Sequence, residues 1–269
     1  MRNAVEMPDF TGKGVKRVRG RPRRSGHAAA ICVAGVLAAA ILAVVLLKFV
    51  FVVRGVEYEG ASNLDIDAIT RASGIRLGGS IFSVDPEKVR QNVDALGEVT
   101  LEEARTRLPS TVVLRVRARD ATGMFLYSGG LAVLDEAGYV VRRTDQVPDE
   151  DLVYVTGLHV IQCRTGALLE AEKGQAEGYA AVAQALRQHG AQAYVSELNV
   201  EDPEDMRILT RTGVTVKLGG AENMNNKIAW MRTAVADLEA RRETGVTLDV
   251  QSGTKADLLG SRSTGVNAQ

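Results

Sequence analysis

Histidines and neighbouring acids are the residues of this sequence that would be considered first for catalysis or metal binding. The three histidines, His27, His159 and His189, are far apart, and none has a partner at zinc-ligand spacing. The run Asp149-Glu150-Asp151 follows Pro148, and adjacent loop residues do not converge on one point. We interpret it as a solvated turn. The sequence therefore predicts neither a metal site nor a histidine-centred catalytic site.

Nucleotide-binding and hydrolase motifs are also missing. Gly12-Lys13-Gly14 lacks the third glycine of a dinucleotide fingerprint, and no strand precedes it. No GxxxxGK[ST], HExxH or GxSxG pattern occurs. We expect a protein that is not an enzyme, with no cofactor and no small-molecule substrate. Because catalytic groups can converge from distant positions, a membrane-tethered cell-wall enzyme stays as an alternative.

Charge is unevenly distributed along the 269 residues, although 33 basic and 33 acidic side chains cancel in total. Residues 1–27 hold eight basic and two acidic residues, a net charge of about +6, which leaves about −6 for the rest. Nucleic acid is a poor partner for this tail, because its one aromatic residue is Phe10 and it has no folded context. Membrane topology and attraction to anionic lipids explain it better.

An uncharged apolar segment follows the basic tail and runs from Ala28 to Leu47. Twenty helical residues reach about 30 Å, the hydrocarbon thickness of a bilayer. The segment is longer than a signal-peptide core, and no A-x-A-like cleavage site follows it. We predict a retained transmembrane helix over 28–53. The positive-inside rule places 1–27 in the cytoplasm and 54–269 outside it.

Residues 54–122 carry the signals of a small β-α-α-β-β domain. Asn63 is the expected cap of a first helix that ends at Gly74. Asp85 and Pro86 begin a second helix, which ends at Gly97. Strands are expected at 56–59, 99–107 and 111–119. We expect both helices on one face of the sheet.

The strand at 111–119 alternates apolar residues with Arg115, Arg117 and Arg119. We interpret these arginines as the solvated face of a half-buried sheet. A docking surface for an acidic partner is the alternative.

Residues 123–250 are predicted to form a second mixed α/β domain with an antiparallel-rich sheet, which makes the whole chain α+β. Turn residues and periodicity separate its elements. Strands are predicted at 131–135, 139–144, 193–200, 207–210, 214–218 and 246–250. A helix is predicted at 167–188, with an interruption near Gly174 or Gly178, and another at 223–242, with Ile228, Met231, Val235 and Leu238 on one apolar stripe.

The strand at 246–250 is the last one predicted, and 251–269 reads as a disordered Gly/Ser/Thr-rich tail. A last strand often lies at a sheet edge with unpaired backbone groups. Such an edge can accept a strand from another protein.

Seven stretches in this order resemble the FtsQ/DivIB family of bacterial cell-division proteins, single-pass membrane proteins with a POTRA-type domain. The stretches are Val53–Gly60, Ser73–Asp85, Arg107–Val116, Leu134–Val140, Val216–Gly219, Lys227-Ile228 and Leu248–Val250. The chain departs from the family pattern at Leu108-Pro109, at Ala118–Ala121 and after Asp249, where the aromatic and basic residues of some members are absent.

The resemblance implies a non-enzymatic divisome scaffold at the division septum that links early and late division proteins. Its implied partners are membrane proteins of FtsB/FtsL (DivIC/FtsL) type. By position, the partner-binding strand would consist of Val246, Thr247, Leu248, Asp249, Val250, Gln251 and Ser252, with Lys227 as a weaker candidate. Backbone pairing would supply the affinity of this site.

Two further classes of envelope protein are alternatives. A single-pass sensor would need a folded signalling segment in the cytoplasm, and residues 1–27 are short and charged. An outer-membrane assembly factor would need tandem POTRA repeats or a following β-barrel, and neither pattern is evident.

Overall fold

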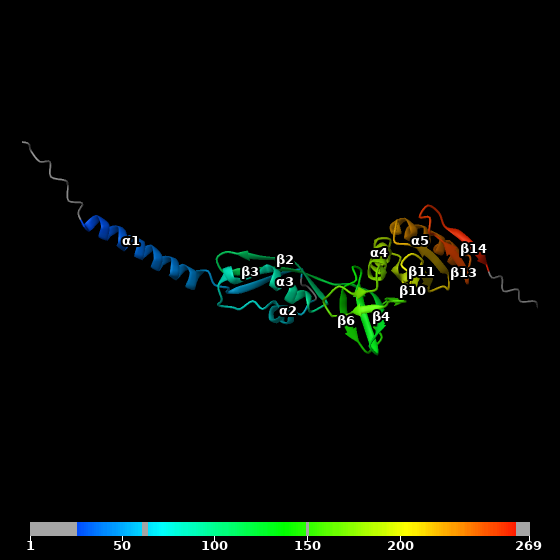
Figure 1. The fold of residues 1–269 in the computed structure, drawn as a ribbon, viewed down its shortest axis with the longest axis horizontal. Coiled ribbons are helices and arrows are strands. Elements are labelled where there is room, and N and C mark those ends of the chain that lie inside the picture. The colour runs from blue at the N-terminus through cyan, green and yellow to red at the C-terminus, as the bar shows by residue number, and fades with distance from the viewer. Residues whose placement is uncertain (1–25, 61–63, 149–150, 262–269) are drawn as a thin grey trace, which may run out of the picture. The chain divides into compact units, whose positions relative to one another are not determined.

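The computed structural model describes residues 26–60, 64–148 and 151–261 (Figure 1). The chain divides into two units, residues 1–48 and residues 49–269. The described part of the second unit holds three sheets, and the two larger ones correspond to the two domains expected outside the membrane.

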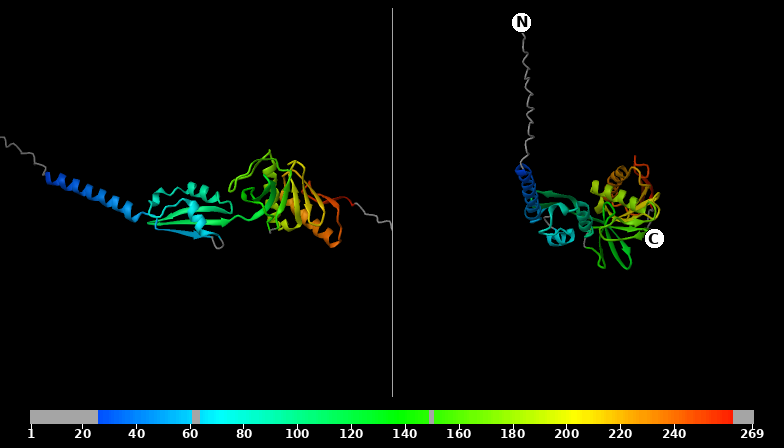
Figure 2. Two further views of the ribbon diagram at one scale, coloured as in Figure 1. Left: turned by 90° about the horizontal axis from the view of Figure 1, so that it is seen from below. Right: turned by 60° about the vertical axis from the view of Figure 1, so that its left-hand side comes forward.

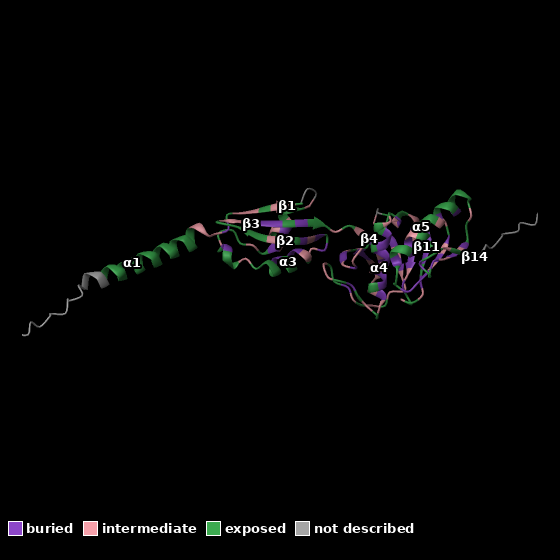
Figure 3. Cartoon of the chain, turned by 90° about the horizontal axis from the view of Figure 1, so that it is seen from above, coloured by how far each residue is buried: buried purple, intermediate pink, exposed green. Residues whose placement is uncertain are grey.

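The apolar segment forms helix α1 (Gly26–Val45), which continues as a short π-helix (Leu46–Val50). A stretch of 21 residues, Ala30–Val50, is long and apolar enough to cross a membrane, with a mean hydropathy of 3.0. Its side chains are exposed along almost the whole stretch (Figure 3). An apolar helix of this length that the other described residues leave exposed fits a membrane anchor.

The first domain has the expected β-α-α-β-β order. Its elements are β1 (Gly55–Glu59), α2 (Ile66–Ser73), a 3₁₀ turn (Ile81–Ser83), α3 (Pro86–Asp94), β2 (Val99–Arg107) and β3 (Thr111–Ala118). The strands lie in the order β1-β3-β2, and β1 runs parallel to β3. Figure 2 shows the two helices and the sheet of this domain from a second direction.

Local capping explains where these helices begin and end. Asp85 Oδ1 accepts hydrogen bonds from the backbone N–H of Glu87 and Lys88, and Gly74 ends α2 in the left-handed region at φ 70°. The cap of α2 is Asp65, whose carboxylate accepts from Ala68 N–H at 3.0 Å. The prediction of Asn63 as the cap was therefore wrong; Asn63 itself lies outside the described residues.

The alternation of β3 separates a core face from a charged face. Val112, Leu114 and Val116 are buried against Ile69 of α2 and Val89 of α3. Helices therefore cover one face of the small sheet, as the pattern predicts.

The second domain is built on a nine-stranded mixed sheet in the order β14-β13-β12-β11-β10-β7-β4-β5-β6. Its strands are β4 (Ala121–Tyr127), β5 (Gly130–Asp135), β6 (Val140–Thr144), β7 (Val153–Thr156), β10 (Val195–Asn199), β11 (Met206–Thr210), β12 (Thr215–Gly219), β13 (Val246–Asp249) and β14 (Asp257–Ser261). A separate hairpin pairs β8 (Val160–Gln162) with β9 (Glu170–Ala171).

Two helices, α4 (Gln175–Gln188) and α5 (Met224–Ala240), share one core with this sheet. The stripe predicted for α5, Ile228, Met231, Val235 and Leu238, is almost fully buried. The helix predicted from residue 167 begins only at Gln175, because residues 170–171 pair with β8 and Gly174 adopts φ 86°.

Candidate partner-binding edge

The predicted edge strand at 246–250 forms β13, but it does not lie at the edge. β13 pairs in parallel with β12 on one side and antiparallel with β14 on the other. Leu248 is opposite Val216 of β12 and Leu258 of β14. The edge assignment for 246–250 was therefore wrong, because the chain turns back and adds one more strand.

A tight turn brings β14 back onto β13. Asp249 Oδ1 accepts from Gln251 N–H at 3.0 Å, and Gly253 N–H donates to Val250 O at 2.9 Å. Gly253 has φ 67°, a conformation that favours glycine. Residues 251–261 are thus a turn and a strand, which corrects the prediction of a disordered tail for this part; residues 262–269 lie outside the described chain.

The seven predicted partner-binding residues divide into buried and accessible ones. Val246, Leu248 and Val250 belong to the core of the second domain. Thr247 and Asp249 are half-buried, and the turn residues Gln251 and Ser252 are exposed. Within this segment, only the turn therefore offers fully exposed side chains to a partner.

Lys227, the weaker candidate, is buried in α5 and binds the backbone just after β12. Its side chain is 3% exposed, and its Nζ donates to Gly220 O at 2.8 Å. Burial lowers the pKa of its ammonium group, while Glu222, 3.8 Å from Nζ, opposes that shift. This burial leaves Lys227 almost no surface for a direct contact with a partner.

The exposed strand at this end of the sheet is β14, which sequence reasoning missed. Leu258 is 54% exposed and Leu259 is 44% exposed, although successive side chains point to opposite faces of a strand. The preceding Ala256 packs against the core. A short strand held by its backbone, with two exposed leucines, can pair with an added strand.

The arginines of β3 do not form a free basic surface. Arg115 Nη2 lies 3.0 Å from Glu59 Oε2, and Arg117 Nε lies 3.1 Å from Glu102 Oε1, both at the surface. These pairs agree with the solvated-face interpretation. Because both arginines already pair with acids of neighbouring strands, the surface is not a basic patch awaiting an acidic partner.

Arg119 departs from that interpretation because its side chain is only 6% exposed. Its Nη1 donates to Asp135 Oδ2 at 2.8 Å, and its guanidinium lies 4.1 Å from the centre of the Tyr139 ring. Asp135 also accepts from the N–H of Ala137 and of Tyr139. Arg119 thus stabilises the start of the second domain.

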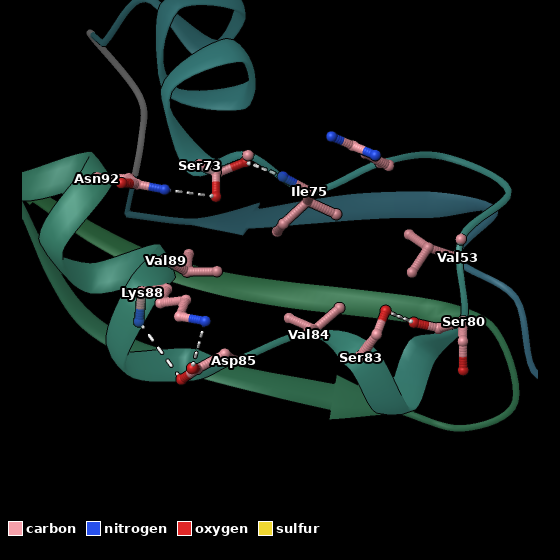
Figure 4. A pocket seen from close by; sticks show the side chains of 13 residues that line it. Val53, Ser73, Ile75, Ser80, Ser83, Val84, Asp85, Lys88, Val89 and Asn92 are labelled. Carbon is pink, nitrogen blue, oxygen red and sulfur yellow. Dashed lines mark hydrogen bonds and ion pairs between the residues drawn. The ribbon is translucent and has the colours of Figure 1, made fainter.

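A cleft of about 500 Å³, lined by polar and apolar side chains, lies beside α3 in the first domain (Figure 4). Lys88 Nζ faces Asp85 Oδ2 at 3.7 Å, and Asn92 donates to Ser73 O. Ser83 Oγ donates to Ser80 O at 2.6 Å. These polar groups bind one another, and the described residues contain no cluster suited to a metal ion.

Comparison with known proteins covers both domains. Residues 51–119 match the family model of the FtsQ-type POTRA domain, and residues 126–252 match that of the C-terminal region of cell division protein FtsQ/DivIB. The second match ends before β14. The first match covers the small sheet with its two helices, and the second covers most of the larger strand-rich domain.

Individual relatives carry the same names. The chain is 28% identical to cell division protein FtsQ of Corynebacterium glutamicum over 189 residues, 68% of this chain and 78% of that protein. It is 20% identical to cell division protein DivIB of Clostridium botulinum over 182 residues, 66% of this chain and 70% of that protein. It is 30% identical to FtsQ of Caulobacter vibrioides over 107 residues, which is 40% of this chain and 35% of that protein.

The described residues thus combine an apolar helix that fits a membrane anchor with a POTRA domain and a mixed strand-rich domain. The chain belongs to the FtsQ/DivIB family of cell division proteins. This family consists of non-catalytic, division-site membrane proteins that interact with other division proteins, and membership supports a role in cell division. The helix α1 fits the single membrane anchor of such a protein.

Proposed function

We propose that this chain is a non-enzymatic scaffold of the divisome that links early and late division proteins. Its N-terminus lies in the cytoplasm, and residues 54–269 lie outside. The basic tail and the apolar α1 support this orientation through the positive-inside rule. In this role the anchor restricts the two outer domains to the membrane, where they meet their partners.

The proposed partners are membrane proteins of FtsB/FtsL (DivIC/FtsL) type, bound at the β14 end of the large sheet. The observation that carries this proposal is the position of β14 at the end of the strand order. An extended partner segment would pair with its outer backbone groups, while Leu258 and Leu259 would contact the side chains of that segment.

The segment 246–252 keeps a role in this proposal. β13 provides the pairing surface that holds β14, and its buried residues tie that pair to the core. Gln251 and Ser252 in the turn would lie beside one end of an added strand. Side chains at the turn would then contribute to selectivity more than to affinity.

A fluorescent fusion to the N-terminus in dividing cells tests the division role. We expect a ring at midcell for the full chain. A uniform signal around the cell would contradict the proposal and favour a sensor or another general envelope protein.

A chain that ends at Ala256 lacks β14 and tests the binding site. We expect it to lose copurification of the FtsB/FtsL-type partner. Leu126→Arg, a change at a leucine of β4 that is 66% exposed, is the matched control and should keep the partner. If the shortened chain binds normally, the site lies elsewhere. A midcell ring without partner binding would show that recruitment uses a different surface.

A further inference from the structure

Large apolar side chains are exposed at one end of the first domain. Leu77 and Phe82, in the connection between α2 and α3, are 67% and 61% exposed. Leu108, in the turn between β2 and β3, is 57% exposed. Exposed apolar side chains that gather at one place mark an interaction surface.

Hydrogen bonds place both loops at the end where the chain enters the domain. Gly78 N–H donates to Val53 O at 2.8 Å, and Arg54 N–H donates to Ser110 O at 2.8 Å. The rings of Phe51 and Phe82 lie 5.3 Å apart between centres. Figure 4 shows Val53 and Ser80 together at this end of the cleft. We name Phe51, Leu77, Phe82 and Leu108 the apolar tip.

Basic side chains accompany the apolar tip. Arg54 and Arg76 are exposed, and in the described chain neither forms an ion pair with an acidic side chain. Arg54 Nη2 instead donates to Phe49 O at 2.9 Å. Apolar side chains beside unpaired arginines match the interface of an anionic lipid bilayer.

Chain continuity decides which partner this surface fits. The stretch able to cross a membrane ends at Val50, and Phe51, the next residue, is already part of the apolar tip. Arg54 follows within four residues, which span at most about 14 Å when fully extended. The headgroup layer of the membrane that holds α1 is therefore within reach of the tip.

We propose that the apolar tip docks the first domain on the surface of this membrane. Leu77, Phe82 and Leu108 enter the interfacial layer, and Arg54 and Arg76 contact lipid phosphates. Docking restricts how the first domain can tilt above the bilayer. The proposal rests on α1 as a membrane anchor and does not depend on the identity of the division partner.

Lipid quenching of a probe on the full chain tests this contact. In a background of Cys32→Ala and Cys163→Ala, an environment-sensitive fluorophore is attached at Phe82→Cys, Leu108→Cys or Leu126→Cys. Each protein is reconstituted into vesicles of phosphatidylcholine and phosphatidylglycerol with spin-labelled lipids. We expect at least about twofold stronger quenching at positions 82 and 108 than at position 126, because apolar side chains lie at the acyl boundary. Circular dichroism verifies that each variant is folded.

The arginines are tested in the same vesicles. Arg76→Glu should weaken quenching at position 82, and so should vesicles of phosphatidylcholine alone. Equal quenching at positions 82 and 126, or none at 82, would overturn the proposal. Vesicle flotation tests the anchor separately: a chain that does not float has no membrane anchor, and the docking proposal fails with it.

Discussion

Two edge strands of this protein, β1 in the small sheet and β14 in the large one, carry different side chains. β1 places Glu57 and Glu59 at its surface, where they pair with Arg107 and Arg105 at 2.7 Å each. β14 exposes Leu258 and Leu259 instead. Charged side chains protect an unpaired edge from other strands, whereas apolar ones permit pairing. The comparison indicates that the charged edge β1 resists pairing with another strand, whereas the apolar edge β14 permits it.

The strand at the opposite end of the large sheet, β6, also carries charged side chains. There β6 carries Arg142 and Arg143, and the Arg143 guanidinium lies 5.1 Å from the centre of the Tyr127 ring. Within one sheet, the charged strand β6 and the apolar strand β14 thus form the two ends. The chemistry of the ends favours partner addition at β14 alone.

Proline substitution should separate the inner strand from the edge strand and give the largest effect. Leu248→Pro removes a pairing donor and a buried side chain from β13, so we expect a loss of about 3–5 kcal/mol in the free energy of unfolding. Leu258→Pro in β14 should cost about 1 kcal/mol or less, because edge strands tolerate proline. Urea unfolding of the full chain in detergent measures both. Equal losses would show that β14 is as integral to the fold as β13.

Charges added to β14 should convert the available edge into a protected one. Leu258→Arg combined with Leu259→Arg should weaken binding of an FtsB-type segment at least about tenfold, or about 1.4 kcal/mol. Stability should change by about 0.5 kcal/mol or less, because both side chains are exposed. Fluorescence anisotropy measures the affinity, with Leu126→Arg as the control. Unchanged affinity would remove β14 from the interface.

Removal of charge from β1 should allow this edge to pair with a strand of another molecule. Glu57→Val combined with Glu59→Val leaves an apolar edge strand, and we expect the protein to self-associate through it. Analytical ultracentrifugation measures the shift toward dimers. The control is Glu87→Val, which removes an exposed glutamate from helix α3 and leaves both sheet edges unchanged. A variant that stays monomeric would show that these glutamates do not protect the edge.

Acid should destabilise the small sheet, with the smallest effect of the four predictions. The hydrogen bond from Arg115 lowers the pKa of Glu59, so the folded state holds the proton less tightly than the unfolded state. The stabilisation is complete above the unfolded pKa of about 4.3 and disappears as the pH falls through the folded pKa. Acid unfolding of the wild type and of Glu59→Gln should therefore differ above this range and converge below it. The difference should be small, because exposed pairs contribute little.

Local patterns were sufficient to predict most elements of the first domain and several of the second. Asp85-Pro86 begins α3, Gly74 ends α2, and the apolar alternation of β3 faces the helices as expected. These features depend on residues within a few positions of one another. The same holds for the buried stripe of α5, since side chains three and four apart share a helix face.

For the candidate site, the sequence predicted the inner strand β13 but not the edge strand β14. The residues 246–250 have strand periodicity, but Asp257–Ser261 is a short segment with two adjacent leucines and no alternation, so it gave no strand signal. The dipeptide Ser252-Gly253 is a turn signal in the sequence, and in the structure Gly253 has the positive φ of the turn that reverses the chain. The resemblance pointed to β13, which the structure places one strand inside the end of the large sheet.

Sequence alone was enough to establish the apolar anchor, the order of the first domain and the family, because each depends on composition, spacing or the order of short motifs. Tertiary structure decided which strand ends the large sheet and that Lys227 and Arg119 are buried. Strand order and burial are set by pairing between segments distant in the chain. A lysine or an arginine in the sequence looks the same whether it faces water or a carbonyl of another element.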